Sequence, residues 1–224
     1  EISECLVGSE MCIRDRINRA TPRTQSALLE CMEEHQVTVD GEYSKLEEPF
    51  VVIATQNPIE TAGTYQLPEA QLDRFLMKIN MGYPEKDDEV LILNRFLTSN
   101  PEITLEKVAT CEDVIAMKED AKNVYIHPVL IEYIVELARM TRNEENVLTG
   151  VSPRGTLGML NAARAYAYVS GRDYVVPEDI KILAPYVWAH RLVLQTGFMN
   201  RDNKEQIIGN VVSKTAVPTE DWNR

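Results

Sequence analysis

The chain has 224 residues, of which 44% are hydrophobic and 26% are charged, so it can bury one sizeable core or two smaller ones. Its formal net charge of -12 argues against nucleic acid as a main partner, because phosphate-binding surfaces need clustered Lys and Arg. No apolar run approaches the roughly 20 residues of a membrane helix, and no signal peptide is recognisable at the N-terminus, so we expect a cytoplasmic protein without a membrane contact.

The four cysteines and three histidines do not have the spacing of a metal site. No two cysteines form a CxxC pair, and the histidines are far apart in the sequence. Neither a zinc site nor a disulfide framework is indicated. The ligands of any bound metal therefore stay unknown at this stage.

An amphipathic helix is expected to begin at Thr21 and Pro22, a residue pair that favours a helix start. Leu28, Leu29 and Met32 then recur at helical spacing. The other side of this helix is acidic and carries Glu30, Glu33 and Glu34.

A hairpin and a strand are expected next. Val37 and Val39 alternate with polar residues ahead of Asp40 and Gly41, a pair that suits a tight turn with positive φ. The continuous apolar run "FVVIAT" (50–55) is typical of a strand that is buried on both faces.

The following segment continues the alternation of helices and strands. A short helix is expected from about Pro68 to Arg74, and a second apolar strand at "FLMKINM" (75–81). Another helix begins beyond Pro84, because acids occupy its first turn and an apolar face follows. This order of elements predicts an α/β layer.

From about Thr98 the pattern becomes helical and predicts a separate bundle. Its expected helices are "CEDVIAMKEDA", "PVLIEYIVELARMTR", "PRGTLGMLNAARAYAYVSG" and "PEDIKILAPYVWAH". The third is expected to stop at Gly171. The tail after Gln195 is polar, and the sequence does not settle whether it is ordered.

Asn57 is the first candidate for a functional residue. It lies just past the carboxyl end of the expected strand 50–55, where open α/β sheets place groups that contact ligands. An Asn before Pro58 is also a common turn signal, so the residue alone leaves both interpretations open.

Several motifs occur in a defined order along the chain. They read "INRATPRTQSALLECMEE", "ATQNP", "GTYQLPEAQLDRF", "GVSPRGTLGMLNAARAYA" and "GRDYVVPEDI". Together they resemble the MoxR family of AAA+ ATPases, from Ile17 to about Leu194. The resemblance implies an α/β fold: the C-terminal portion of a P-loop nucleotide-binding domain (17–97), then an all-helical lid (98–200) and a tail (201–224).

The resemblance also implies roles for single residues. Asn57 matches the sensor-one residue that orients the attacking water, and Arg74 in "LDRF" matches the arginine finger. Arg154 in "SPR" matches the sensor-two arginine of the lid, and Asn18 lies where the family supports the nucleotide edge or the neighbouring subunit. These roles suit phosphoryl transfer, which is catalysed largely by positioning and by fixed positive charge.

Without its motif, Arg74 would suit a different interpretation equally well. It follows a short helix that contains acids, so it could form a surface ion pair with Asp73 or Glu69.

Two parts of the family pattern are missing from the sequence. No glycine-rich loop ends in Gly-Lys-Ser or Gly-Lys-Thr. Where the family reads "DEINRA", this chain has Asp15 at the metal-binding acid and Arg16 at the catalytic glutamate, and an Arg cannot act as a general base. We interpret residues 1–16 as a non-native segment that resembles translated adapter read-through; the alternative is a degenerate subunit.

The resemblance implies an ATPase that uses ATP and Mg²⁺ and forms a homo-oligomeric ring, commonly a hexamer. It also implies chaperone-like remodelling or maturation of partner proteins and a partner with a von Willebrand factor A domain. The chain as printed is expected to be inactive alone. The alternative is a non-enzymatic interaction subunit that donates Arg74 to a neighbour or binds partners through its lid. The sequence does not identify the client or the oligomer number.

Overall fold

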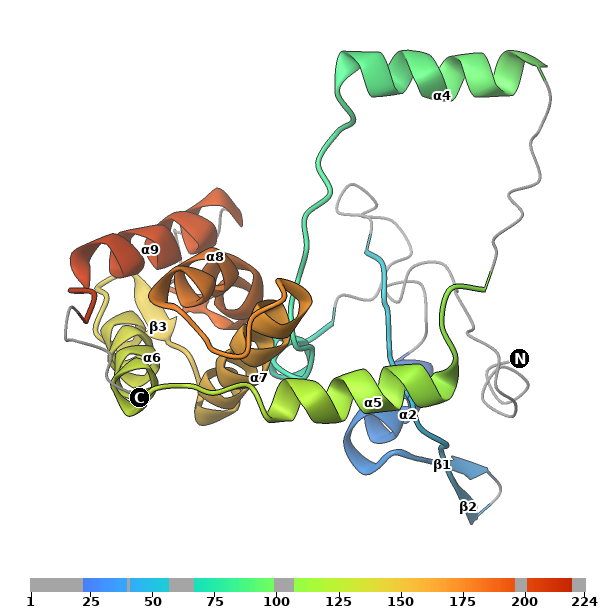
Figure 1. The fold of residues 1–224 in the computed structure, drawn as a ribbon, viewed down its shortest axis with the longest axis horizontal. Coiled ribbons are helices and arrows are strands. Elements are labelled where there is room, and N and C mark those ends of the chain that lie inside the picture. Colours follow the sequence, from blue (N-terminus) through green and yellow to red (C-terminus); the bar gives the residue numbers. More distant parts are fainter. Residues whose placement is uncertain (1–21, 40, 57–66, 99–106, 196–200, 219–224) are drawn as a thin grey trace.

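The computed structural model describes residues 22–39, 41–56, 67–98, 107–195 and 201–218, and most of the elements in these ranges are helices (Figure 1). The first part of the chain contains α2 (Pro22–Glu34), β1 (Gln36–Val39), β2 (Glu42–Lys45), α3 (Glu69–Leu72) and α4 (Lys86–Thr98). The expected amphipathic helix is confirmed, since Leu29 and Cys31 of α2 are 5% and 2% exposed. None of the helices in the described ranges is both long and apolar enough to span a bilayer.

The expected hairpin is confirmed. β1 and β2 pair antiparallel, with Gln36 opposite Lys45 and Val39 opposite Glu42. Gly41 has a φ of 85°, the left-handed conformation that a tight hairpin turn requires and that Gly adopts without steric cost.

The two apolar runs expected to be buried strands are not strands, and this prediction is wrong. Segments 50–56 and 75–81 have no strand assignment, and Val51 and Ile53 are each 70% exposed. A strand forms when neighbouring strands accept and donate its backbone hydrogen bonds. None of the strands in the described residues pairs with either run.

The helix expected beyond Pro84 is confirmed as α4, with Asp87, Asp88 and Glu89 in its first turn. It stands apart from the other helices in Figure 1. Its apolar side chains are exposed accordingly; Leu93 is 62% and Phe96 66% exposed.

The second part of the chain is a helical bundle. Its elements are α5 (Cys111–Lys122), α6 (Pro128–Arg142), β3 (Val147–Thr149), α7 (Pro153–Val169), α8 (Pro177–Trp188), η2 (Ala189–Arg191), β4 (Val193–Leu194) and α9 (Arg201–Lys214). The four helices expected from the sequence are confirmed. The largest fully buried side chains all lie here and include Trp188, Leu130, Leu137, Met159, Ile180, Leu192 and Ile208.

Local chemistry explains where these helices begin and end. The Thr110 hydroxyl accepts from the Asp113 amide while the Asp113 carboxylate accepts from the Thr110 amide, which closes a capping box at the start of α5. The Ser152 hydroxyl caps α7. Gly171 follows the end of α7 with a φ of 74°, as the helix-stopping Gly was expected to do.

The sequence did not predict α9. This helix packs against α6 and α8, and its Ile208 and Val211 are 0% and 1% exposed. Most of its other residues are polar, so the sequence shows no clear apolar face, and its few core-facing side chains are recognised only from the packed bundle.

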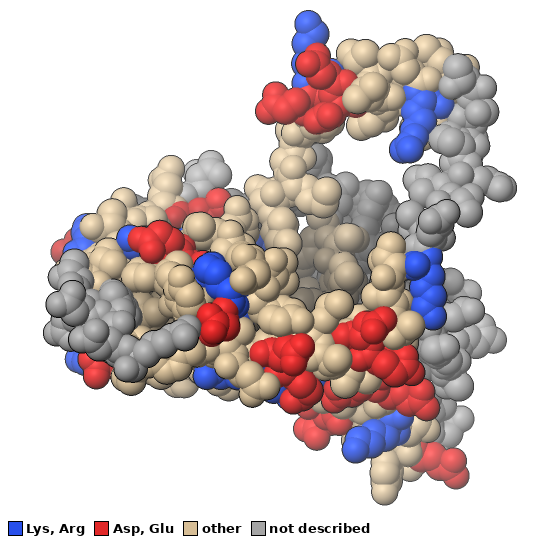
Figure 2. All heavy atoms as spheres, in the orientation of Figure 1, with Lys and Arg blue, Asp and Glu red and all other residues tan. Residues whose placement is uncertain are grey.

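Acidic side chains form patches on one face of the molecule (Figure 2). On the face shown in Figure 2 they gather along α5 and the elements beside it, whereas Lys and Arg are scattered. This distribution agrees with the formal net charge of -12.

Candidate functional site

Arg74 lies in a turn directly after α3 and reaches back to α2. Its Nη1 atom is 2.7 Å from Oε2 of Glu33 and 3.5 Å from the Leu29 carbonyl oxygen. The alternative ion pair of Arg74 with Asp73 or Glu69 is therefore wrong. Asp73 pairs with Arg191 instead, and Glu69 lies 3.9 Å from Lys204.

Arg154 lies in the first turn of α7 and reaches the same carboxylate. Pro153 occupies the first helical position and the Ser152 hydroxyl accepts from the Gly155 amide, so the helix start that carries Arg154 is locally fixed. The Nη2 atom of Arg154 is 2.7 Å from Oε1 of Glu33. Arg74 and Arg154 therefore hold one oxygen each of a single carboxylate.

This arrangement lowers the pKa of Glu33. The hydrogen bond from Arg154 contributes most, and the charges of Arg74 and Arg154 act in the same direction, whereas partial burial opposes them. Glu33 is thus an anion that keeps two guanidinium groups close together.

The donors at this point suit an anion with several oxygens. Each guanidinium carries planar N–H donors and keeps its charge at any physiological pH, and the pair converges from two separate parts of the fold. Phosphate is bound by such groups through charge-assisted hydrogen bonds. The residues present therefore fit the phosphate end of a nucleotide.

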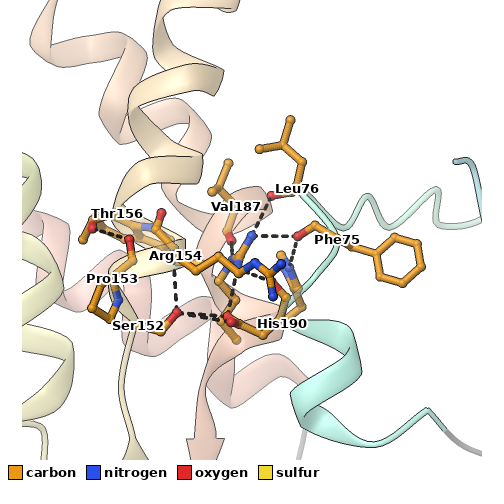
Figure 3. Close-up of polar contacts among 12 residues, drawn as sticks. Phe75, Leu76, Ser152, Pro153, Arg154, Thr156, Val187 and His190 are labelled. Atoms are coloured by element: carbon orange, nitrogen blue, oxygen red, sulfur yellow. Dashed lines mark hydrogen bonds and ion pairs between the residues drawn. The ribbon is translucent and has the colours of Figure 1, made fainter. Parts of the chain in front are cut away.

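The backbone next to Arg74 is held by the helical bundle (Figure 3). Arg191 donates from Nη1 to Oδ1 of Asp73 at 2.8 Å and also to the Asp73 carbonyl oxygen. Its Nη2 donates to the Phe75 carbonyl oxygen at 2.7 Å and to that of Leu76 at 3.4 Å, and its Nε donates to the Val187 carbonyl oxygen at 2.8 Å. The Arg191 side chain is 2% exposed.

Two more side chains of the bundle contact the same segment. Ser152 donates its hydroxyl to the Asp73 carboxylate at 3.2 Å, and a ring nitrogen of His190 lies 3.1 Å from the Phe75 carbonyl oxygen. Burial lowers the pKa of His190 to about 4, and the neighbouring charge of Arg191 acts in the same direction. His190 is therefore neutral near pH 7 and can donate to Phe75.

Close packing explains a glycine in the first turn of α7. A Cβ atom on Gly155 would lie 2.7 Å from Cγ1 of Val151 and 3.1 Å from Cδ of Arg191, and the Gly155 carbonyl oxygen accepts from the Trp188 ring at 2.9 Å. Close packing against Val151, with Arg191 beside it, thus requires the absence of a side chain at Gly155.

Of the four predicted site residues, the structure describes two and brings them together. Arg74 and Arg154 meet at Glu33, whereas Asn57 and Asn18 lie outside the described residues. Sequence reasoning missed Glu33, which looked like part of a polar helix side. It also missed Arg191, although an Arg inside the apolar stretch "YVWAHRLVL" is a signal of a buried, paired charge.

No group of three or more His, Cys, Asp or Glu side chains that could hold a metal occurs in the part of the chain that the structure describes. The sequence assigned no metal ligand either.

Comparison with known families and proteins shows the family of the chain. The family described as "ATPase family associated with various cellular activities (AAA)" matches residues 1–77, and the AAA lid domain matches residues 139–211. Over 215 residues the chain is 47% identical to the uncharacterized protein YeaC of Bacillus subtilis, covering 96% of this chain and 67% of YeaC. Over 222 residues it is 40% identical to chaperone MoxR1 of Mycobacterium tuberculosis, covering 95% of this chain and 58% of that protein.

The chain belongs to the MoxR family of AAA+ ATPases. A crystal structure of a candidate ATPase from Cytophaga hutchinsonii agrees, with a TM-score of 0.82 and 36% identity over 92% of this MoxR-type chain and 65% of that chain. The bundle is thus an AAA lid. The chain spans 58% to 67% of the length of the two relatives named above. The first family match includes residues 1–16, whose non-native origin stays a prediction.

Proposed function

We propose that this chain is part of a ring-forming ATPase in which Arg74 and Arg154 bind the phosphates of ATP. The observation that carries the proposal is the meeting of both guanidinium groups at the two oxygens of Glu33. A carboxylate held in this way has the charge and the oxygen spacing of part of a phosphate group. The MoxR family membership supplies the reaction class, ATP hydrolysis.

The two arginines have different expected roles. Arg74 would act as an arginine finger on the nucleotide of the adjacent subunit, where fixed positive charge stabilises the transition state. Arg154 would bind the same phosphate and link the position of the lid to the bound nucleotide, because it lies in the first turn of the lid helix α7. Since both groups contact one carboxylate, we propose that they serve one and the same bound nucleotide.

Several parts of the site lie beyond these residues. When bound, ATP supplies the phosphoryl group for transfer to water, and Mg²⁺ neutralises charge on the phosphates. We propose that the full-length protein carries the phosphate loop and the pair of acids ahead of Ile17, and that Asn57 orients the water. A hexameric ring, remodelling of client proteins, a von Willebrand factor A partner and a cytoplasmic location stay predictions.

A mixing experiment on the full-length protein tests the role of Arg74. Arg74→Ala should leave ATP binding nearly intact and lower turnover by about 10³ to 10⁵, the range of arginine fingers. In a ring mixed from Arg74→Ala subunits and subunits without the catalytic glutamate, some sites combine the glutamate of one subunit with Arg74 of its neighbour. ATPase activity should therefore reappear.

Two controls make the result decisive. Co-purification of two different tags shows that mixed rings form, and Arg139→Ala provides an arginine substitution in the last turn of α6, away from Glu33. Activity that stays at the level of the separate variants in confirmed mixed rings would refute a finger acting between subunits. Full turnover by Arg74→Ala would instead favour a non-enzymatic or purely structural role for this arginine.

A further inference from the structure

The lid holds the backbone on both sides of Arg74. Asp73, the residue before Arg74, is bound by Arg191 and Ser152. The carbonyl oxygen of Phe75, the residue after Arg74, is bound by Arg191 and His190. One residue separates the two anchor points, so the position of the Arg74 Cα atom is set by lid side chains. Figure 3 shows Phe75 and Leu76 at one side of this network, joined by dashed lines to the side chains of the lid.

Arg191 dominates the network because all three of its guanidinium nitrogens are used and its side chain is 2% exposed. Nε is bound to Val187 within the lid, whereas the partners of Nη1 and Nη2 among the described residues all lie in the segment 73–76. A buried guanidinium without these acceptors would be costly, so Arg191 and the segment stabilise each other's position.

A backbone hydrogen bond adds to this connection. The Lys78 amide donates to the Tyr186 carbonyl oxygen of α8 at 2.9 Å. By contrast, the contacts of Arg74 with α2 are made by the tip of its side chain, at Glu33 and at the Leu29 carbonyl oxygen. The backbone of Arg74 therefore follows the lid, and its contact with α2 is made by the guanidinium.

We propose that Arg191 is a positioning residue for Arg74, and that the lid and the arginine finger move as one body. The part of this inference that concerns catalysis rests on the proposed function of Arg74. Any rotation of the lid would then carry the finger with it. A lid movement in one subunit would thus change the charge presented to the nucleotide of the next subunit.

Amide hydrogen exchange on the 224-residue chain tests the mechanical part without any activity. Arg191→Lys keeps the positive charge but lacks the forked donors, so several hydrogen bonds to 73–76 are lost. We expect the Phe75 and Lys78 amides to exchange about tenfold faster or more, because hydrogen bonds to charged groups at this site restrain local opening. The amides of α6 should keep their protection.

Arg172→Lys is the matched control. Arg172 also forms a two-point ion pair in the lid, with Asp179 at 2.6 and 2.8 Å, but none of its described contacts involves segment 73–76. It should leave exchange at Phe75 and Lys78 unchanged. If Arg191→Lys disturbs α6 as well, Asp73→Asn replaces it, since that change removes the charged acceptor of Arg191 while the backbone acceptors remain. Unchanged exchange at Phe75 and Lys78 in a folded variant overturns the positioning role.

Turnover of the full-length protein tests the catalytic part. Arg191→Lys should lower turnover by about 10²-fold through misplacement of Arg74, with ATP affinity nearly unchanged. Mixing with subunits that lack the catalytic glutamate should restore activity, as for Arg74→Ala. If Arg74→Ala lowers turnover and Arg191→Lys does not, the inference is wrong while the proposed function stands. If Arg74→Ala itself has no effect, the proposed function is wrong and the exchange result alone decides whether Arg191 positions the segment.

Discussion

Arg154 and Glu33 are 121 positions apart in the sequence, yet the lid arginine donates to the carboxylate at 2.7 Å. Glu33 accepts from Arg74 through its other oxygen. One side chain of α2 thus brings together the two arginines that the MoxR resemblance assigned to separate roles.

This shared contact predicts an unusual result when two arginine variants are mixed. If one subunit supplies both arginines to one nucleotide, every junction in a ring of Arg74→Ala and Arg154→Ala subunits lacks one of them. We expect ATPase activity of the mixed ring to stay at the level of the separate variants. Recovery of activity would instead show that Arg154 acts on the nucleotide of its own subunit and Arg74 on that of the neighbour.

The 224-residue chain alone should not bind ATP with micromolar affinity. Arg74 and Arg154 already share the Glu33 carboxylate, and two side chains do not replace a loop of backbone N–H donors and a Lys. Isothermal titration with ATP and Mg²⁺ measures this directly. A titration that shows Mg²⁺-dependent binding in the micromolar range contradicts the expectation.

Two glycines of α7 should respond in opposite ways to the same substitution. Gly155→Ala places a Cβ atom 2.7 Å from Val151, which is 1% exposed, so it should destabilise the lid by about 1–3 kcal/mol. At Gly158 the nearest atom is 3.5 Å away, and Ala should stabilise the helix by up to about 1 kcal/mol. Chemical denaturation of both variants gives the two free energies of unfolding. Equal effects of both substitutions would contradict the packing assigned to Gly155.

The stability of the lid should fall in mild acid because of His190. Its folded pKa of about 4 is below the ordinary value of 6.5, so the unfolded chain binds the extra proton first. The stabilisation is complete above pH 6.5 and is lost as the pH falls towards 4, by up to about 3 kcal/mol. Arg191 and Lys78, which face His190, both oppose its protonation.

His190→Gln isolates this contribution, because Gln can still donate to the Phe75 carbonyl oxygen but does not titrate. The free energy of unfolding of both proteins is measured from pH 7 to pH 4. The unsubstituted protein should lose more stability than the variant over this window. Parallel curves would show that His190 is protonated as easily in the folded lid as in the unfolded chain.

Local patterns predicted the elements that local interactions determine. The helix after Pro84, the hairpin at Gly41 and the stop at Gly171 depend on neighbouring residues, and the structure has all three. The runs 50–55 and 75–81 had the composition of buried strands, but a strand depends on partners elsewhere in the chain. Its existence therefore could not be read from the run itself.

The site was predictable only as far as its motifs extended. "LDRF" and "SPR" identified Arg74 and Arg154, but the contact between them passes through Glu33, which belongs to neither motif. Arg191 is likewise 118 positions from its partner Asp73. Pairings over such separations follow from the packing of the lid against α3, which no short sequence pattern contains.

The location of the apolar core has a consequence for how the chain melts. Its connected cluster of buried side chains runs from Val124 to Val211, while large apolar side chains of 50–56 and α4 face solvent. Cooperative unfolding requires a shared core, so a calorimetric transition of this chain would come from the lid, and segments 50–56 and α4 would add little heat. The calorimetric enthalpy per residue should accordingly be low for a chain of 224 residues.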